Sequence, residues 1–174
     1  MISIFEKSLQ HLLKMEGGYV DHPRDPGGRT NLGVTQRVWE DYTGKPANEA
    51  VMRGLTVAKV APLYKARYWD AVQCDALPPA LAHCVFDFAV NAGPARSARY
   101  LQKLANASAD GKIGPATLRA VQAYVTSHGL ADTVRAFQNL RRTYYRQLGT
   151  FDVFGRGWLR RVDGVETEAL RMIP

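Results

Sequence analysis

Glu16 is the residue whose type and position in this sequence most favour acid–base chemistry. Phe5, Leu9 and Leu12 recur at helical spacing, and Glu16 follows Leu12 four residues later on the same apolar face. Two glycines then end the predicted helix, so the carboxyl group also lies at the negative end of the helix dipole. Desolvation and the helix carbonyl groups both disfavour a negative charge there, and in such surroundings a carboxyl group acts as a general acid.

The loop after Glu16 carries two polar side chains that complement such an acid. Asp25 lies nine residues further, and Thr30 follows in a stretch too rich in Pro and Gly to be helical. One carboxyl group in apolar surroundings and a second in polar surroundings form the usual arrangement for cleaving a glycosidic bond, and a threonine hydroxyl can hold the water. Each residue also has an ordinary interpretation, as a surface glutamate, a turn aspartate or a capping threonine; Thr35 is predicted to be the N-cap of the next helix.

The runs 16–20, 25–28 and 30–35 together resemble the signature of glycoside hydrolase family 108, the muramidases of phage endolysins and related bacterial lysins. The resemblance implies that Glu16 is the catalytic acid. The spacing also resembles the Glu, Asp and Thr arrangement of phage-type lysozymes. This resemblance implies that Asp25 and Thr30 are the catalytic partners of Glu16. The threonine offset is one residue shorter than in the phage lysozymes, so Thr30 and Thr35 are both candidates for holding the water.

Five residues are predicted to bind substrate: Tyr19, Asn31, Thr35, Asp87 and Asn91. The segment 86–93 is similar to the helix-ending segment of such lysozymes that lines the sugar cleft. Asn91 is there either a sugar ligand or a helix cap before Gly93. Asp87 interrupts an apolar run, and if buried it needs a partner such as a tyrosine or an arginine.

The second half resembles the small peptidoglycan-binding domain that commonly follows this catalytic region, on the segment 110–117, where a turn leads into a helix with Pro115 at its first position. We therefore predict a muramidase catalytic region at 1–89 and a helical peptidoglycan-binding region at 90–174. No linker separates them, and we expect one compact body. The resemblance implies a mainly α fold, with a lysozyme-like helical body and a small irregular hairpin or loop region beside the cleft.

The net positive charge of the chain belongs entirely to the second half. Lys and Arg number ten against ten Asp and Glu in residues 1–89, and thirteen against six in residues 90–174. Five arginines are predicted to lie on solvated helix faces: Arg135, Arg142, Arg146, Arg160 and Arg161. Such a surface attracts polyanions, and we favour peptidoglycan over nucleic acid because no basic motif is interleaved with aromatic residues.

Apolar periodicity predicts helices at about 3–16, 35–43, 57–69, 79–92, 94–105, 115–126, 131–148 and 156–172, with 17–34 as the one hairpin-like stretch. Pro62 is expected to start or kink its helix. Cys74 and Cys84 are predicted to be free thiols in preference to a disulfide. Histidine spacing indicates no metal site, we expect no cofactor, and no apolar run is long enough for a membrane span.

Three functions are consistent with these residues. The first is hydrolysis of the β-1,4 bond between N-acetylmuramic acid and N-acetylglucosamine, giving cell-wall degradation, bacteriolysis and antimicrobial activity. The second is lytic transglycosylation, which Asp25 disfavours because a second carboxylate helps to activate water. The third is non-catalytic wall binding. The polar N-terminus is not typical of a secretory signal, so we expect a monomer made in the cytoplasm and released to the wall by a holin or a secretion pathway.

Overall fold

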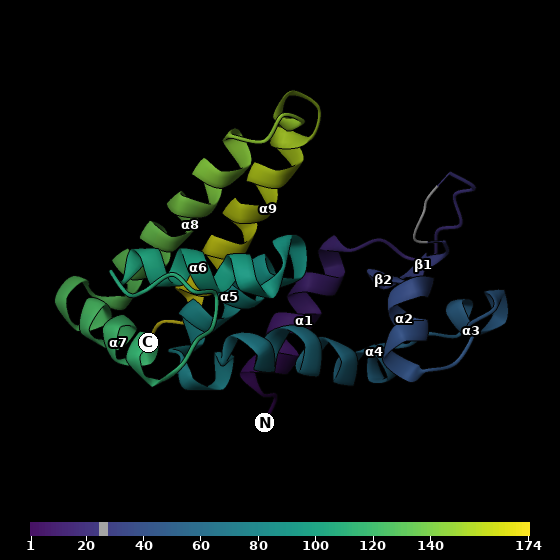
Figure 1. The fold of residues 1–174 in the computed structure, drawn as a ribbon, viewed down its shortest axis with the longest axis horizontal. Helices are drawn as coiled ribbons and strands as arrows, with labels where there is room; N and C mark the ends of the chain where they lie inside the picture. The colour runs from purple at the N-terminus through teal and green to yellow at the C-terminus, as the bar shows by residue number, and fades with distance from the viewer. Residues whose placement is uncertain (25–27) are drawn as a thin grey trace.

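The computed structural model describes residues 1–24 and 28–174, and these are mainly α-helical, as the sequence predicts (Figure 1). The helices of the first half are α1 (Ile4–Met15), α2 (Gln36–Thr43), α3 (Glu49–Arg53), α4 (Val57–Tyr64) and α5 (Pro79–Ala92). Those of the second half are α6 (Pro94–Leu104), α7 (Pro115–His128), α8 (Leu130–Arg146) and α9 (Phe151–Arg171). A small antiparallel hairpin of β1 (Thr30–Asn31) and β2 (Val34–Thr35) lies in the stretch predicted to be hairpin-like.

Helix α5 is the element around which both halves of the chain pack. Its residues from Ala80 to Ala89 are all buried, and it contacts α1 on one side and α6, α8 and α9 on the others. One apolar core extends from Phe5 in α1 to Ala169 in α9. The predicted boundary between residues 89 and 90 falls inside α5, so the two predicted regions share this helix and a single core.

The hairpin has a tight turn and is bound to two neighbouring segments. Leu32 and Gly33 form its two-residue turn and both have positive φ angles, which is the requirement of the type I′ turn that suits twisted strands. The buried Asn31 side chain donates a 2.9 Å hydrogen bond to the carbonyl of Met52 in α3. Val20 pairs with Thr30 as an isolated bridge, and thereby brings the segment after α1 beside the hairpin.

The predicted helix 57–69 is two different helices in the structure. Helix α4 continues through Pro62, and at Lys65 it changes into a π-helix, η1 (Lys65–Trp69), followed by short 3-10 turns at Asp70–Val72 and Cys74–Ala76. π-helical segments are rare and are frequently found at functional sites. Apolar periodicity does not distinguish 3.6 residues per turn from the wider π-helical winding over so short a stretch.

Two other differences from the predicted helices concern α3 and α9. The five-residue α3, which has an Asn48 N-cap, is too short to show a period. Helix α9 begins at Phe151 and not at residue 156, so Gly155 lies inside the helix and does not precede it. A Cβ atom at Gly155 would overlap the Phe151 ring, so this glycine permits close packing and does not mark a boundary.

The antiparallel pair α8 and α9 projects from the rest of the molecule, and the lower part of α9 packs on α5 (Figure 1). Both cysteines are buried and free, which confirms the prediction of free thiols. In the part of the chain that the structure describes, no helix is long and apolar enough to cross a membrane.

Candidate active site

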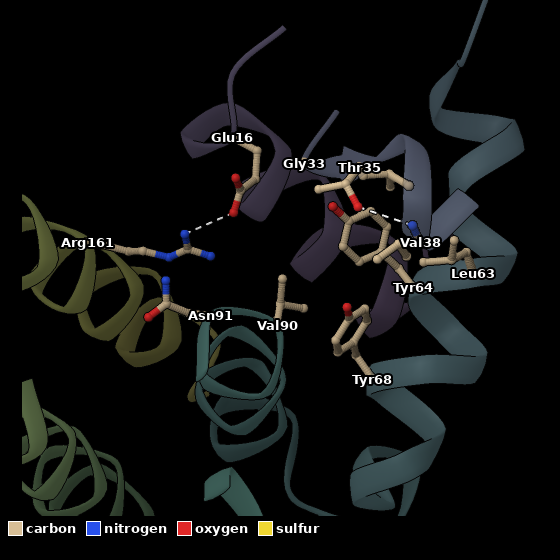
Figure 2. Close-up of a pocket in the computed structure, with 11 residues that line it drawn as sticks. Glu16, Gly33, Thr35, Val38, Leu63, Tyr64, Tyr68, Val90, Asn91 and Arg161 are labelled. Carbon is tan, nitrogen blue, oxygen red and sulfur yellow. Dashed lines mark hydrogen bonds and ion pairs between the residues drawn. The ribbon is translucent and has the colours of Figure 1, made fainter. Parts of the chain in front are cut away.

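A cavity of about 320 Å³ lies where the end of α1, the hairpin, α4 and the end of α5 meet α9 (Figure 2). It is lined by Glu16, Gly33, Val34, Thr35, Val38, Leu63, Tyr64, Tyr68, Val90, Asn91 and Arg161. The lining residues thus come from both predicted regions of the chain. No single element can form this cavity.

Glu16 lies where the sequence places it, at the end of the first helix. It is the C-cap of α1, with an extended backbone and an N–H that donates to the Leu12 carbonyl. Its side chain turns into the cavity and is 25% exposed. Of the described residues that line the cavity, Glu16 alone carries a carboxyl group.

Arg161 of α9 reaches across the cavity to Glu16 (Figure 2). Its Nη1 donates to Glu16 Oε1 at 2.9 Å, while its Nε and Nη2 donate to the Asp87 carboxylate at 3.1 and 3.0 Å. The side chain is only 14% exposed, so the prediction that Arg161 is solvated is wrong. Arg142 is also largely covered, by Asp163 and Glu166. Sequence periodicity missed both contacts because each joins residues far apart in the chain or in different helices.

Asp87 is the buried centre of a charged network behind this wall of the cavity. Its carboxylate, 2% exposed, lies 2.7 Å from Nη2 of the fully buried Arg141. Burial alone would raise the pKa of Asp87, but the guanidinium groups of Arg141 and Arg161 outweigh it and lower the pKa to about 2. The prediction that a buried Asp87 needs an arginine or tyrosine partner is confirmed.

Arg141 and Tyr145 connect this network to the cavity, and the sequence analysis did not identify either of them as part of the site. Arg141 Nε donates to the hydroxyl of Tyr145, which in turn donates to Asn91 Oδ1 at the cavity. A signal was present, because Arg141 falls on the apolar stripe of α8 and Asp87 falls on the apolar α5. Two opposite charges on buried stripes indicate an ion pair between the helices.

The opposite wall of the cavity is formed by tyrosines and a tight turn. Tyr64 donates a 2.7 Å hydrogen bond to the Leu32 carbonyl, and burial followed by the charge of Glu16 raises the pKa of its hydroxyl. A Cβ atom at Gly33 would lie 2.6 Å from Tyr64 Oη and 3.0 Å from Glu16 Cγ. Gly33 therefore permits the hairpin to approach both side chains closely.

The structure separates the two candidate threonines. Thr35 lines the cavity and its Oγ1 accepts from the Val38 N–H at 3.1 Å, which confirms it as the N-cap of α2. Its hydroxyl proton remains to be donated. Thr30 is paired with Thr35 across the hairpin and is not among the lining residues. Of the two threonines, only Thr35 therefore lines the cavity.

The remaining predicted site residues have different surroundings. Asp25 lies outside the described residues. Tyr19 lies 4.1 Å beneath the Arg53 guanidinium and Asn31 is tied to α3, and neither lines the cavity. Asn91 does line it; Gly93 is the C-cap of α5, so the alternative that Asn91 is the cap is wrong. Within the described residues, no three His, Cys, Asp or Glu side chains gather as a metal site.

Comparison with known proteins identifies the family to which the chain belongs. Residues 9–93 match the model of the family described as glycosyl hydrolase 108, and residues 96–163 match one described as a predicted peptidoglycan domain. No curated protein sequence matches the chain significantly. A solved structure of Brucella abortus SagA is 38% identical, with a TM-score of 0.83 over 97% of this chain and 94% of that one. The chain therefore belongs to glycosyl hydrolase family 108, and is a glycoside hydrolase of peptidoglycan with a C-terminal peptidoglycan-binding domain.

Proposed function

We propose that the protein is an N-acetylmuramidase, which cleaves the β-1,4 bond between N-acetylmuramic acid and N-acetylglucosamine with Glu16 as the general acid. The observation that carries this proposal is the position of Glu16, the single carboxyl group among the described lining residues. It lies between apolar and aromatic side chains on one side and a fixed guanidinium on the other (Figure 2).

The proposed reaction requires a proton at the glycosidic oxygen and a water at the anomeric carbon. Arg161 binds Oε1 of Glu16, and Oε2 remains to carry the proton to the leaving oxygen as the bond to the anomeric carbon breaks. Water then supplies hydroxide to that carbon and its remaining proton returns to a carboxylate. Asp25 is the proposed second carboxylate, and the Thr35 hydroxyl is suited to hold the water.

Asn91 is suited to bind the sugar. Its Oδ1 is occupied by the Tyr145 hydroxyl, which fixes the orientation of the amide group. Two Nδ2 protons are then available at the cavity, where sugar hydroxyl and acetamido oxygens are acceptors. Asp87 contributes to the site indirectly, because it anchors Arg161.

Product analysis tests the bond that is cleaved. Purified sacculi are digested, the products are reduced with borohydride, and the released muropeptides are analysed by mass spectrometry. We expect reduced N-acetylmuramic acid ends. Reduced glucosamine ends would show a glucosaminidase, and 1,6-anhydro ends would show a lytic transglycosylase, so either result contradicts the proposal.

A substitution tests the acid. Glu16→Gln keeps the size of the side chain but delivers no proton, so turnover of sacculi should fall by at least ~10² while the fold is retained. Glu49→Gln, at an exposed glutamate of α3, is the matched control and should leave turnover unchanged. Near-wild-type activity of Glu16→Gln would exclude this residue as the acid.

For the biological role, we propose cell-wall lysis after release from the cytoplasm, through a holin or a secretion pathway. Support comes from the peptidoglycan-binding domain and from the excess of arginine in the second half. Production in a Gram-negative host should lyse the cells only when a holin or an added export signal delivers the enzyme to the periplasm. Lysis without either would contradict this route.

A further inference from the structure

A second cavity, of about 480 Å³, adjoins the one that contains Glu16. It is lined by Met15, Asn91, Gly157, Trp158, Arg160 and Arg161. Asn91 and Arg161 line both cavities, so the two are neighbours that share a wall. None of the roles assigned above uses the second cavity, and most of its lining comes from one helix, α9.

The open space at Gly157 is the first feature of the second cavity. Glycine is unfavourable in the interior of a helix relative to alanine, and α9 contains three glycines, Gly155, Gly157 and Gly164. Gly155, two residues before Gly157, is explained by the Phe151 ring. A Cβ atom at Gly157 or at Gly164 would meet nothing within 4 Å, and of these two only Gly157 lines the cavity. The missing side chain leaves backbone exposed to the cavity and keeps its space open.

Arg160 is the second feature. Its neighbour Arg161 is occupied by Glu16 and Asp87, whereas Arg160 is exposed and has no ion-pair partner within the described residues. A guanidinium group matches a carboxylate in shape and charge. Beside it, Trp158 is held by stacking on Tyr145, with ring centroids 5.3 Å apart. The cavity thus combines a fixed aromatic ring, an open helix backbone and an available positive charge.

We propose that the second cavity binds the acidic stem peptide of peptidoglycan, with a peptide carboxylate on Arg160 and the peptide chain over Gly157 and Trp158. This proposal rests on the muramidase function proposed above. The stem peptide is attached to the N-acetylmuramic acid at the scissile bond, so it must leave the catalytic cavity through an adjoining space. A glycan strand without stem peptides carries only the lactyl carboxylate, which is attached directly to the N-acetylmuramic acid ring, and has no peptide carboxylate for Arg160 to bind.

The test compares glycan strands that carry stem peptides with strands from which an amidase has removed them. The measured quantity is the ratio of kcat/KM for the two substrates. Arg160→Gln should lower this ratio about tenfold, the effect of losing one charge-assisted hydrogen bond. The control, Arg146→Gln, removes an equally exposed arginine from α8 outside the cavity and should leave the ratio unchanged.

A second pair of variants tests the open space. Gly157→Leu should fill the cavity and also lower the ratio. Gly164→Leu is its control, because Gly164 is in the same helix, has equal room for a Cβ atom, and does not line the cavity. Calorimetry of a soluble disaccharide peptide with the Glu16→Gln enzyme gives a readout independent of cleavage, in which Arg160→Gln should weaken binding by the same factor.

The outcomes are distinguishable. A ratio that stays at the wild-type value in both Arg160→Gln and Gly157→Leu overturns the proposal, as does an equal effect of Arg146→Gln, which would indicate diffuse charge attraction. If Gly157→Leu does not fold, Arg160→Gln and the calorimetry decide. A wild-type enzyme that cleaves neither substrate would refute the muramidase function, and one that cleaves both equally well would refute only the stem-peptide site.

Discussion

The two walls of the cavity that contains Glu16 are built on different physical principles. The wall from the first half of the chain relies on close approach: the Leu32–Gly33 turn, Tyr64 and Glu16 fit together with no room for a side chain at Gly33. The wall from the second half relies on charge, with Arg161 and Arg141 sharing the buried Asp87. Steric changes should therefore damage the first wall, and changes of charge the second.

The difference also changes how the net charge of +7 should be interpreted. The arginines of α8 and α9 do not form one solvated surface. Arg141 and Arg161 neutralise acidic groups at the site, while Arg146 and Arg160 are exposed. The peptidoglycan-binding domain contributes Arg161 to the cavity that contains Glu16, so it forms part of the candidate site.

The largest expected effect comes from breaking the charged wall. Asp87→Asn leaves Arg141 buried without a counter-charge, so the free energy of unfolding should fall by about 3–5 kcal/mol. Urea denaturation measures this. Asp163→Asn, at the exposed partner of Arg142, is the control and should cost less than about 1 kcal/mol. Equal small effects would show that charge does not hold this wall together.

The free energy of unfolding should decrease at acid pH because of the buried His83. Burial lowers the pKa of His83 from 6.5 to about 4, and four other groups modulate it: Asp87, His11, Glu168 and Arg141. Below pH 6.5 the unfolded chain binds a proton that the folded chain does not, so His83 should cost about 3 kcal/mol of stability as the pH falls from 6.5 to 4.

Denaturant titrations between pH 7 and pH 4.5 check this slope. The difference in stability between the two pH values should shrink in His83→Gln, and stay as in the wild type in the control His128→Gln, which alters an exposed histidine of α7. An identical pH dependence in wild type and His83→Gln would mean that His83 does not titrate as its burial implies.

The wall of the first half should be sensitive to one added methyl group. Gly33→Ala imposes a positive φ on alanine and crowds Tyr64 Oη, so unfolding should become easier by about 1–3 kcal/mol, and turnover should fall because Glu16 is displaced. Gly44→Ala shares the positive φ but has open space, and is the matched control. Only an excess loss at Gly33 supports a wall built on close approach.

The smallest expected effect distinguishes the two threonines. Thr35→Ala should cost about 1 kcal/mol through the lost N-cap, and should also reduce turnover. Thr35→Ser keeps the hydroxyl and should restore both properties, and Thr30→Ala should leave turnover nearly unchanged. A loss of turnover in Thr30→Ala with wild-type activity of Thr35→Ala would reverse the assignment.

Much of the fold and the position of Glu16 were predictable from local pattern. The apolar period and the Gly pair place Glu16 at the end of α1, Thr35 is recognisable as an N-cap, and the Pro and Gly signals bound α5 correctly. These features depend on neighbours a few residues away. The π-helical turn after Tyr64 and the inclusion of Gly155 in α9 were not predictable, because packing decides them.

The sequence by itself determined the helical composition, the family signature and the carboxyl group at the helix end, since each depends on residues that are close to one another in the chain. Tertiary structure decided which side chains meet that carboxyl group. Arg161 lies 145 residues from Glu16, and Asp87 lies 74 residues from Arg161. No local period encodes such contacts. They exist because α9 packs against α5. The charged groups buried there require partners of opposite charge.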